Sequence, residues 1–215
     1  MDVKEVKVMK KILSANDKIA DELRTDLGKK GIFYLNLMSS PGSGKTSLIE
    51  KTAQMTDKKI SVIEGDIQTT LDAERVAKYG VKAYQINTGP FGGDCHLESG
   101  WIKNALDEIG TDETDILFVE NIGNLVCPAE FDVGSHVNVV LLSVTEGEEK
   151  PLKYPLAFNT SQVCLITKTD LLPYLDIKIE AIRENIKKVN PQMEIIELSS
   201  KTGEGMNKWI EYLTK

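Results

Sequence analysis

Residues 39–46 (SSPGSGKT) have the composition of a loop that binds the phosphates of a nucleotide. Glycines let the backbone amides point inward at phosphate oxygens, and a helix beginning near Lys45 adds unpaired N–H groups. Lys45 can reach the β- and γ-phosphates, while the hydroxyl of Thr46 can bind Mg²⁺. Ser39 stands where this pattern usually has glycine, and the alternative is a purely structural turn between a strand and a helix. The predicted nucleotide-binding residues here are Gly42, Ser43, Gly44, Lys45, Thr46 and Ser47.

Residues 167–170 (TKTD) follow an apolar strand and have the residue types that recognise guanine. The Asp170 carboxylate can accept hydrogen bonds from both N1–H and the exocyclic amine of guanine, which adenine does not offer. At about 1.5–3 kcal/mol per charged hydrogen bond, this difference favours GTP over ATP by roughly a hundredfold or more. Lys168 can lay its stem along the base, and Thr167 replaces the usual asparagine, which predicts a looser link to the phosphate loop. The predicted base-binding residues are Lys168, Asp170 and, in the SSK segment after the last strand, Ser200 and Lys201; the alternative is a polar turn.

Acidic residues at the ends of two strands are candidates for holding Mg²⁺. Glu120 ends the strand ILFVE and precedes Gly123 in an E-x-x-G pattern, so its carboxylate can hold the ion directly or through water. The Gly123 amide can meet the γ-phosphate, and Asp66 follows the second strand in the sequence EGD. The predicted magnesium ligands are Thr46, Asp66 and Glu120. Asp72 is a weaker candidate, because an acidic residue there also suits the first turn of a helix.

Cysteine and histidine residues form a second candidate site. Cys95 and His96 are adjacent, and Cys127 follows the segment expected to sense the γ-phosphate. Thiolate and imidazole ligands suit Ni²⁺ or Zn²⁺ and not Mg²⁺, although the same residues also occur in ordinary polar loops. Three ligands leave a metal site incomplete, so a second subunit can complete it. Cys164 lies inside an apolar strand and is expected in the core, while His136 is expected at the surface or as a cap.

Composition and charge limit the classes of protein to which the chain can belong. The length of 215 residues fits one α/β domain. The formal net charge of −7 argues against a nucleic-acid-binding protein. The charged N-terminus lacks the apolar core of a secretion signal, and the longest apolar run, 137–144, is too short to span a membrane. Three cysteines, an odd number, argue against a disulfide framework. We therefore expect a cytoplasmic protein that binds neither nucleic acid nor membrane.

The hydrophobic pattern predicts an α/β fold with a mainly parallel sheet flanked by helices. Residues 3–27 carry apolar residues at every third or fourth position, which indicates an amphipathic helix ended by glycines at 28 and 31. The predicted strands are 32–38, 60–63, 81–86, 116–119, 137–144, 163–166 and 195–198. The other predicted helices are 45–55, 71–78, 98–109, 177–189 and 205–213. In such sheets ligands bind at the carboxyl ends of the strands, where we expect the motifs above to lie.

These motifs together resemble the HypB family, the GTPases that help insert nickel into [NiFe]-hydrogenase. The resemblance covers nearly the whole chain and is carried by LNLMSSPGSGKTSLIEK, VIEGD followed by DAERV, INTG before CHLE, FVENIGNLVCPAEFD, SVTEGEEKPLKYP and TKTDLLPY. It implies a P-loop NTPase fold of the SIMIBI-type G domain, with an N-terminal helix at 1–30 and the GTPase domain at 31–215. It also implies slow hydrolysis of GTP to GDP and phosphate, with Mg²⁺ bound beside GTP.

The resemblance further implies how the protein works as an assembly. Two subunits are expected to close on each other with GTP, forming a homodimer in which Lys153 reaches the partner's γ-phosphate. The family's interface site for Ni²⁺ or Zn²⁺ corresponds to Cys95, His96 and Cys127. The implied role is that of a metallochaperone in [NiFe]-hydrogenase maturation, with a maturation partner and the precursor of the hydrogenase large subunit. The implied catalytic residues are Lys45, Asp66, Glu120 and Lys153.

The sequence departs from the family pattern in three places. Residues 1–38 contain neither cysteine nor histidine, so we expect no N-terminal nickel-binding motif in this stretch. Gly100 and Asn104 stand where some members have further histidines, and PFGGD before Cys95 differs from the usual loop. Three other functions are alternatives. The urease nickel GTPase should have Cys-Pro-His where this chain has Cys-Pro-Ala, and a small-molecule kinase should prefer ATP. The third is a scaffold that binds nucleotide without turnover.

Overall fold

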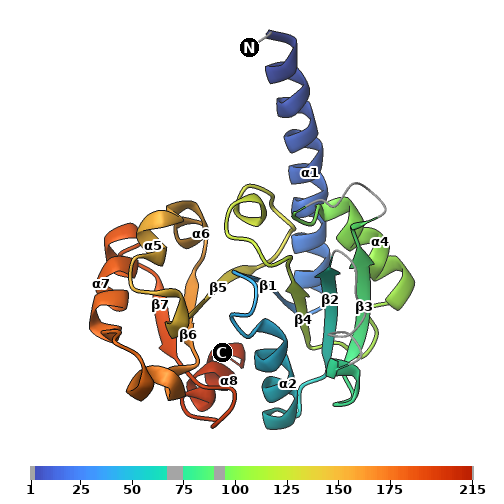
Figure 1. Ribbon diagram of the computed structural model, residues 1–215. Coiled ribbons are helices and arrows are strands. Elements are labelled where there is room, and N and C mark those ends of the chain that lie inside the picture. Colours follow the sequence, from blue (N-terminus) through green and yellow to red (C-terminus); the bar gives the residue numbers. More distant parts are fainter. Residues whose placement is uncertain (1–2, 67–74, 90–94, 215) are drawn as a thin grey trace.

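The computed structural model describes residues 3–66, 75–89 and 95–214, with only the backbone considered for residues 3–13. A seven-stranded sheet crosses the molecule in the order β3-β2-β4-β1-β5-β6-β7, and every neighbouring pair is parallel (Figure 1). The strands are β1 (Phe33–Ser39), β2 (Ile60–Asp66), β3 (Lys82–Asn87), β4 (Ile116–Glu120), β5 (Val137–Ser143), β6 (Val163–Thr167) and β7 (Glu194–Glu197). The predicted parallel sheet is confirmed, and each predicted strand is present at or near its expected position.

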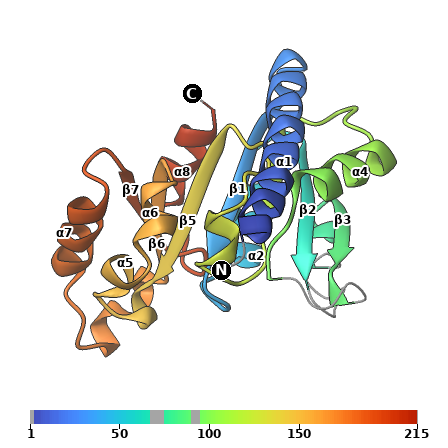
Figure 2. The same ribbon diagram turned by 90° about the horizontal axis from the view of Figure 1, so that it is seen from above.

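Helices cover both faces of this sheet, as Figure 2 shows. They are α1 (Val3–Lys29), α2 (Lys45–Met55), α4 (Ser99–Ile109), α5 (Lys150–Lys153), α6 (Pro155–Asn159), α7 (Ile179–Val189) and α8 (Met206–Leu213). The side chains of α2 and α8 pack on one face, and those of α1, α4, α6 and α7 pack on the other. The first turns of α1 extend beyond the sheet (Figure 1). None of the helices in the described part of the chain has both the length and the apolar character needed to cross a membrane.

Differences from the predicted helices are confined to short or undescribed segments. The predicted helices at 45–55, 98–109, 177–189 and 205–213 are confirmed, and α1 continues two residues beyond its predicted end, to Lys29. The sequence did not predict α5 and α6, because helices of four and five residues are too short to show a hydrophobic period. Of the helix predicted at 71–78, residues 75–77 are helical, whereas 71–74, including Asp72, lie outside the described residues.

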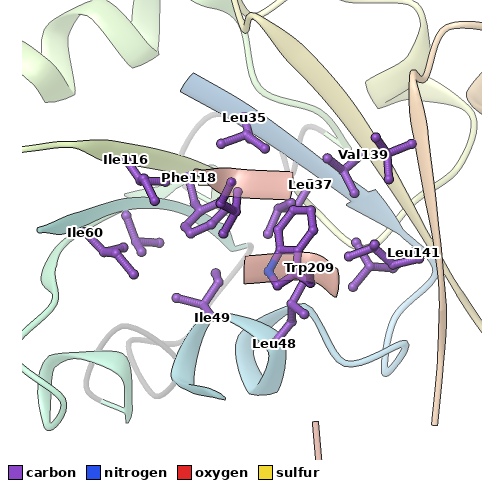
Figure 3. Close-up of a cluster of buried hydrophobic side chains, with 14 of the residues drawn as sticks. Leu35, Leu37, Leu48, Ile49, Ile60, Ile116, Phe118, Val139, Leu141 and Trp209 are labelled. Carbon is purple, nitrogen blue, oxygen red and sulfur yellow. The ribbon is translucent and has the colours of Figure 1, made fainter. Parts of the chain in front are cut away.

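A cluster of buried apolar side chains fixes α2 and α8 against the sheet (Figure 3). Trp209 of α8 is fully buried against Phe118 of β4 and donates from Nε1 to the Thr52 hydroxyl of α2 at 3.0 Å. Leu48 and Ile49 of α2 are also fully buried. Burial of each large apolar side chain stabilises the fold by about 1.5–3 kcal/mol. The helix that starts at the phosphate loop is therefore held in a fixed position.

His136 is a structural residue that joins α1 to β1, and not the surface or capping histidine expected. Its Nδ1 accepts from the Tyr34 backbone amide at 3.0 Å, so the remaining ring proton is on Nε2, which lies 3.0 Å from the Arg24 carbonyl oxygen. His136 directly precedes β5, and the structure places the start of β5 beside both β1 and α1, so the ring contacts both elements. Cys164 is fully buried in β6, as predicted, and burial raises the pKa of its thiol.

Candidate functional site

A pocket of about 450 Å³ opens at the carboxyl ends of the central strands. It lies between the phosphate loop, which connects β1 to α2, and the ends of β2 and β4. Gly42 and Gly44 adopt φ values of +73° and +102°, which residues with a Cβ rarely adopt, so the turn requires glycine at these positions. Of the predicted residues, those lining this pocket are Gly42, Gly44, Lys45, Thr46, Ser47, Asp66, Glu120, Gly123 and Lys168.

Lys45 and Thr46 are both buried at the floor of this pocket. The Lys45 ammonium donates to the Ser39 hydroxyl at 3.1 Å, so the serine that replaces the usual glycine is an acceptor for this lysine. The Thr46 hydroxyl donates to the Glu120 carboxylate at 2.8 Å. The structure thus brings together two predicted magnesium ligands that are 74 residues apart in sequence.

Carboxylates line the pocket at the ends of two neighbouring strands. Glu64 and Glu120 are paired in register on β2 and β4, and both are at most 5% exposed. Glu64 and Asp66 are two residues apart on β2, so their side chains share one face. Hydroxyl and carboxylate oxygens are the ligands that Mg²⁺ prefers, and the donor set therefore fits this ion. Sequence reasoning missed Glu64, although a glutamate inside an otherwise apolar strand was the signal that marked it.

The loop predicted to bind guanine is joined directly to the phosphate loop. The Thr167 hydroxyl donates to the Ser43 carbonyl oxygen at 2.7 Å, and the Lys168 ammonium donates to the Gly42 carbonyl oxygen at 2.6 Å. Thr167, which replaces the usual asparagine, thus keeps a direct hydrogen bond between the two loops; whether the link is looser than with asparagine stays a prediction. Lys168 has φ of +59°, a rare conformation for a residue other than glycine.

Asp170 is oriented by Ser199, the first residue of the SSK segment, which was not among the predicted base-binding residues. The hydroxyl of the fully buried Ser199 donates to one oxygen of the Asp170 carboxylate at 2.7 Å. Ser199 is itself held, because its backbone amide donates to the Glu204 carbonyl oxygen at 2.9 Å. Ser200 and Lys201 follow directly in the loop after β7. The first serine of the SSK segment thus fixes the carboxylate that is expected to select guanine.

The two lysines of α5 have different environments. Lys150 lies 3.4 Å from the Glu146 carboxylate, which also accepts from the Ser43 hydroxyl of the phosphate loop at 2.7 Å. Lys153 is 65% exposed and pairs with the 70% exposed Glu149 at 3.0 Å. An exposed pair of this kind contributes only about 0–1 kcal/mol, so Lys153 can leave it at little cost. Sequence reasoning missed Glu146, which connects the phosphate loop to α5.

The structure places the Cys95 segment (residues 95–99) beside the Cys127 segment (residues 127–132). The His96 ring stacks on Phe131 with 3.7 Å between centroids, and its Nε2 lies 3.8 Å from the Glu98 carboxylate. Both ring nitrogens of His96 are buried and have no hydrogen-bond partner among the described residues. Cys95 and Cys127 are half-buried, and neither forms a disulfide with another described cysteine. These donors have the chemistry for Ni²⁺ or Zn²⁺, but the described residues of one chain contain no group of three that could hold a metal ion.

Residues 123–127 connect the nucleotide pocket with the thiol donors. A Cβ on Gly123 would lie 3.0 Å from the Pro41 ring and 3.1 Å from its backbone, so the backbone at Gly123 packs closely on the phosphate loop. Asn124 forms a β-bridge with Ser39, and its side-chain amide donates to the Cys95 carbonyl oxygen at 3.4 Å. This segment therefore touches the phosphate loop at one end and contains Cys127 at the other.

Comparisons with known proteins agree with this geometry. The family model described as the CobW/HypB/UreG nucleotide-binding domain matches residues 34–197. The hydrogenase maturation factor HypB of Azotobacter vinelandii is 46% identical over 212 residues, which are 98% of this chain and 69% of that protein. The crystal structure of HypB from Helicobacter pylori in complex with nickel has a TM-score of 0.87 and 40% identity, covering 93% of this chain and 94% of that chain.

A more distant neighbour shows the type of fold. The signal recognition particle 54 kDa protein from Aeropyrum pernix, in complex with GDP, has a TM-score of 0.60 at 14% identity, covering 91% of this chain and 53% of that one. The predicted fold class, a mainly parallel sheet flanked by helices, is confirmed by the strand order and by this shared fold. The identity over the length of the Azotobacter relative, the family match and the fold lead to one assignment: this chain belongs to the HypB family of hydrogenase maturation factors, within the CobW/HypB/UreG group.

Proposed function

We propose that this protein is a GTP-hydrolysing metallochaperone in which GTP-driven dimerisation controls the binding and delivery of nickel, or zinc, during [NiFe]-hydrogenase maturation. Its reaction is GTP + H₂O to GDP + phosphate, slow in the isolated protein. Its partners are a second copy of the chain, a maturation partner and the precursor of the hydrogenase large subunit. This role goes beyond family membership, and the site geometry supports it in four ways.

Guanine selection is supported by the rigid placement of Asp170. With one carboxylate oxygen held by Ser199 at 2.7 Å, the group is oriented before the nucleotide arrives. Two charge-assisted hydrogen bonds to guanine then cost little reorganisation. Lys168 lines the nucleotide pocket and covers the base with its stem, while Ser200 and Lys201 back the base from the loop after β7.

Phosphate binding and hydrolysis are assigned to the floor of the pocket. Gly42 to Ser47 surround the phosphates, and Lys45 leaves the Ser39 hydroxyl to bind the β- and γ-phosphates. Mg²⁺, when bound, neutralises developing charge on the phosphate oxygens, and Thr46, Asp66 and Glu120 are the residues that would hold it. Lys153 adds a positive charge at the γ-phosphate of the partner subunit. Of the two lysines on α5, Lys153 is the one exposed enough to reach a second molecule.

Nickel is the cargo, held by Cys95, His96 and Cys127 from both copies of the chain. The described residues of one chain contain no group of three that could hold a metal ion, which supports a site shared between subunits. Thiolates favour a square-planar arrangement around Ni²⁺ and a tetrahedral one around Zn²⁺. Hydrolysis relaxes the segment around Gly123, so the affinity for the cargo falls when GDP is formed.

The observation that carries this proposal is the contact pattern of residues 123–127. Gly123 packs on Pro41 of the phosphate loop, and Asn124 contacts both Ser39 and Cys95. A shift of this segment at the γ-phosphate therefore reaches Cys127 within four residues. The proposed coupling between the γ-phosphate and the metal site therefore runs through this one short segment.

Complementation between two inactive variants tests the dimeric mechanism. Lys45→Ala removes the phosphate lysine, and Lys153→Ala removes the lysine offered to the partner. Each variant alone should hydrolyse GTP far more slowly than the wild type in single-turnover assays. A mixture should regain activity, because a Lys153→Ala chain keeps an intact phosphate loop and receives Lys153 from the Lys45→Ala chain. A mixture as slow as its components would contradict catalysis across the dimer.

A further inference from the structure

Helix α1 carries a buried asparagine on a face that is otherwise apolar. Asn16 is 6% exposed, and the residues that follow it on this face include Ala20, Leu23 and Leu27. A buried amide costs free energy unless all its hydrogen-bonding atoms have partners. Asparagine is also a poor helix former, so neither propensity nor apolar packing accounts for it here. The contacts of its side chain must therefore supply the reason.

Asn16 forms hydrogen bonds to two segments that are far apart in the sequence. Its Oδ1 accepts from the Ser99 backbone amide at 2.9 Å, and its Nδ2 donates to the Asp132 carbonyl oxygen at 2.8 Å. The Ser99 hydroxyl lies 2.8 Å from the Asn16 carbonyl oxygen and 2.9 Å from Oδ1. The amide orientation is unambiguous, because one neighbour can only donate and the other can only accept.

These two neighbours end the segments that carry the metal donors. Ser99 is the first residue of α4 and comes three residues after His96. Leu97, between them, is fully buried, and a Cβ on Gly65 would lie 2.8 Å from it, so this segment has little freedom to shift. Asp132 comes five residues after Cys127. One amide on α1 therefore fixes both the Cys95 segment and the Cys127 segment.

Other contacts hold the end of the Cys127 segment firmly to α1. Arg24 donates to the Asp132 carboxylate at 2.6 Å and to the Ser135 carbonyl oxygen at 2.9 Å. A Cβ on Gly134 would lie 2.6 Å from the Ala20 carbonyl oxygen, so the two backbones are in close contact. Helix α1 is also adjacent to α4, as Figures 1 and 2 both show. The helix is thus a rigid support for both segments.

Direct contacts between the two metal-bearing segments are weaker than their contacts with α1. Phe131 meets the His96 ring only by stacking, and Asn124, just before the Cys127 segment, contacts the Cys95 carbonyl oxygen at the long distance of 3.4 Å. Stacking leaves the separation of backbones adjustable, whereas the two hydrogen bonds of Asn16 are short and directional. The spacing between the thiols consequently depends on α1.

We propose that Asn16 is a positioning residue of the metal site, which sets the spacing between Cys95 with His96 on one side and Cys127 on the other. The inference rests on the proposed function, because it takes these three residues as the nickel donors. Asn16 does not bind the metal itself. Groups that hold metal ligands in place affect metal affinity strongly, typically by about 10- to 100-fold when they are substituted.

Two substitutions separate the two halves of this support. Asn16→Asp keeps an acceptor for Ser99 but places a carboxylate oxygen against the Asp132 carbonyl oxygen, so it breaks the link to the Cys127 segment. Ser99→Ala removes only the hydroxyl contact on the side of the Cys95 segment, and it serves if the buried charge of Asn16→Asp prevents folding. Lys18→Gln, at an exposed position of α1, is the matched control.

The test is a nickel titration of the full-length chain with a GTP analogue, followed by the thiolate-to-nickel absorption band. GTP-analogue affinity is measured in parallel without nickel, and thermal stability is measured for each variant. We expect Asn16→Asp to bind nickel about 10- to 100-fold more weakly, with an altered band, and Ser99→Ala to show a smaller shift in the same direction. GTP affinity without nickel should stay at the value of the Lys18→Gln control.

Cys95→Ala distinguishes failure of this inference from failure of the proposed function. If Cys95→Ala loses nickel binding while Asn16→Asp and Ser99→Ala bind nickel like the control, the positioning role is wrong and the metal site stands. If Cys95→Ala binds nickel as tightly as the wild type, the assignment of the donors is wrong, and the inference falls with it. A loss of thermal stability in Asn16→Asp with unchanged nickel affinity and band would make Asn16 a purely structural residue.

Discussion

The nucleotide pocket and the thiol donors lie next to each other but differ in completeness. The pocket is assembled within one chain, with the phosphate loop joined to the base loop through Thr167 and Lys168 and to α5 through Glu146. On the metal side, the described part of one chain has no complete set of ligands. Under the proposed function, we expect that a single subunit binds GTP by itself, whereas tight metal binding needs a second copy of the chain.

Lys45→Ala should separate the two regions most clearly. Loss of two charge-assisted contacts, each worth about 1.5–3 kcal/mol, predicts GTP affinity lower by roughly a hundredfold or more. Fluorescent GTP-analogue binding measures this effect. Nickel affinity in the absence of nucleotide should not change, because the hydrogen bond of the Lys45 ammonium goes to Ser39 of the phosphate loop and not to a proposed metal donor. A comparable loss of nucleotide-free nickel binding would contradict the separation of the two sites.

Asp170→Asn should change the base that the pocket selects. The new amide presents a donor to the exocyclic amine of guanine, which predicts a loss of about 1.5–3 kcal/mol, or roughly 10- to 150-fold in GTP affinity. Xanthine has a carbonyl group where guanine has this amine, so xanthosine triphosphate should bind the variant better than GTP does. Competition between the two nucleotides measures the change, and continued preference for GTP would show that another residue selects the base.

Tyr34→Phe tests how the end of the Cys127 segment is held in the fold. The buried Tyr34 hydroxyl donates to the Val133 carbonyl oxygen at 2.7 Å, next to Asp132. We expect the free energy of unfolding to fall by about 1–3 kcal/mol at neutral pH, with GTP affinity unchanged. Chemical denaturation measures the free energy of unfolding. A loss of GTP affinity as large as the loss of stability would show that the two regions share one support.

Tyr34 also makes the free energy of unfolding depend on pH. Burial, aided by the charge of Asp132, raises the pKa of Tyr34 well above its usual value, so the folded protein keeps the phenol neutral. The neutral phenol stabilises the fold below about pH 10, the pKa of tyrosine in the unfolded chain, and this stabilisation is lost as the pH rises above that value. The stability difference between wild type and Tyr34→Phe should therefore shrink above about pH 10. A difference that stays constant to higher pH would contradict the buried neutral phenol.

Thr167→Val should give the smallest effect, confined to the nucleotide side. It removes the hydrogen bond to the Ser43 carbonyl oxygen while keeping the shape of the side chain. The expected cost is about 1 kcal/mol, or roughly fivefold in GTP affinity. Thr214→Val, at an exposed position near the C-terminus, is the matched control. Equal GTP affinity in both variants would mean that the link between the two loops does not position the nucleotide.

Most of the fold and the position of the nucleotide pocket could be predicted, because the sequence patterns that indicate them are local. Apolar runs and glycine-rich turns predicted the strands, and SSPGSGKT and TKTD predicted where the pocket lies. The contacts of Asn16 and Glu146, and the contact of Ser199 in the SSK segment with Asp170, could not be predicted in the same way. Each of these residues acts on a partner at least 29 residues away, and no spacing rule connects such pairs. His136 was expected at the surface or as a cap for the same reason, because its partners come from α1 and β1.

The central claim is that the γ-phosphate and the metal act on the same segment, residues 123–127. Measuring GTP-analogue affinity with and without Ni²⁺, and Ni²⁺ affinity with and without the analogue, tests it most directly. Thermodynamic linkage requires both affinities to rise by the same factor, which we expect to be about 5- to 150-fold. Affinities that are identical with and without the other ligand would contradict coupling between the two sites.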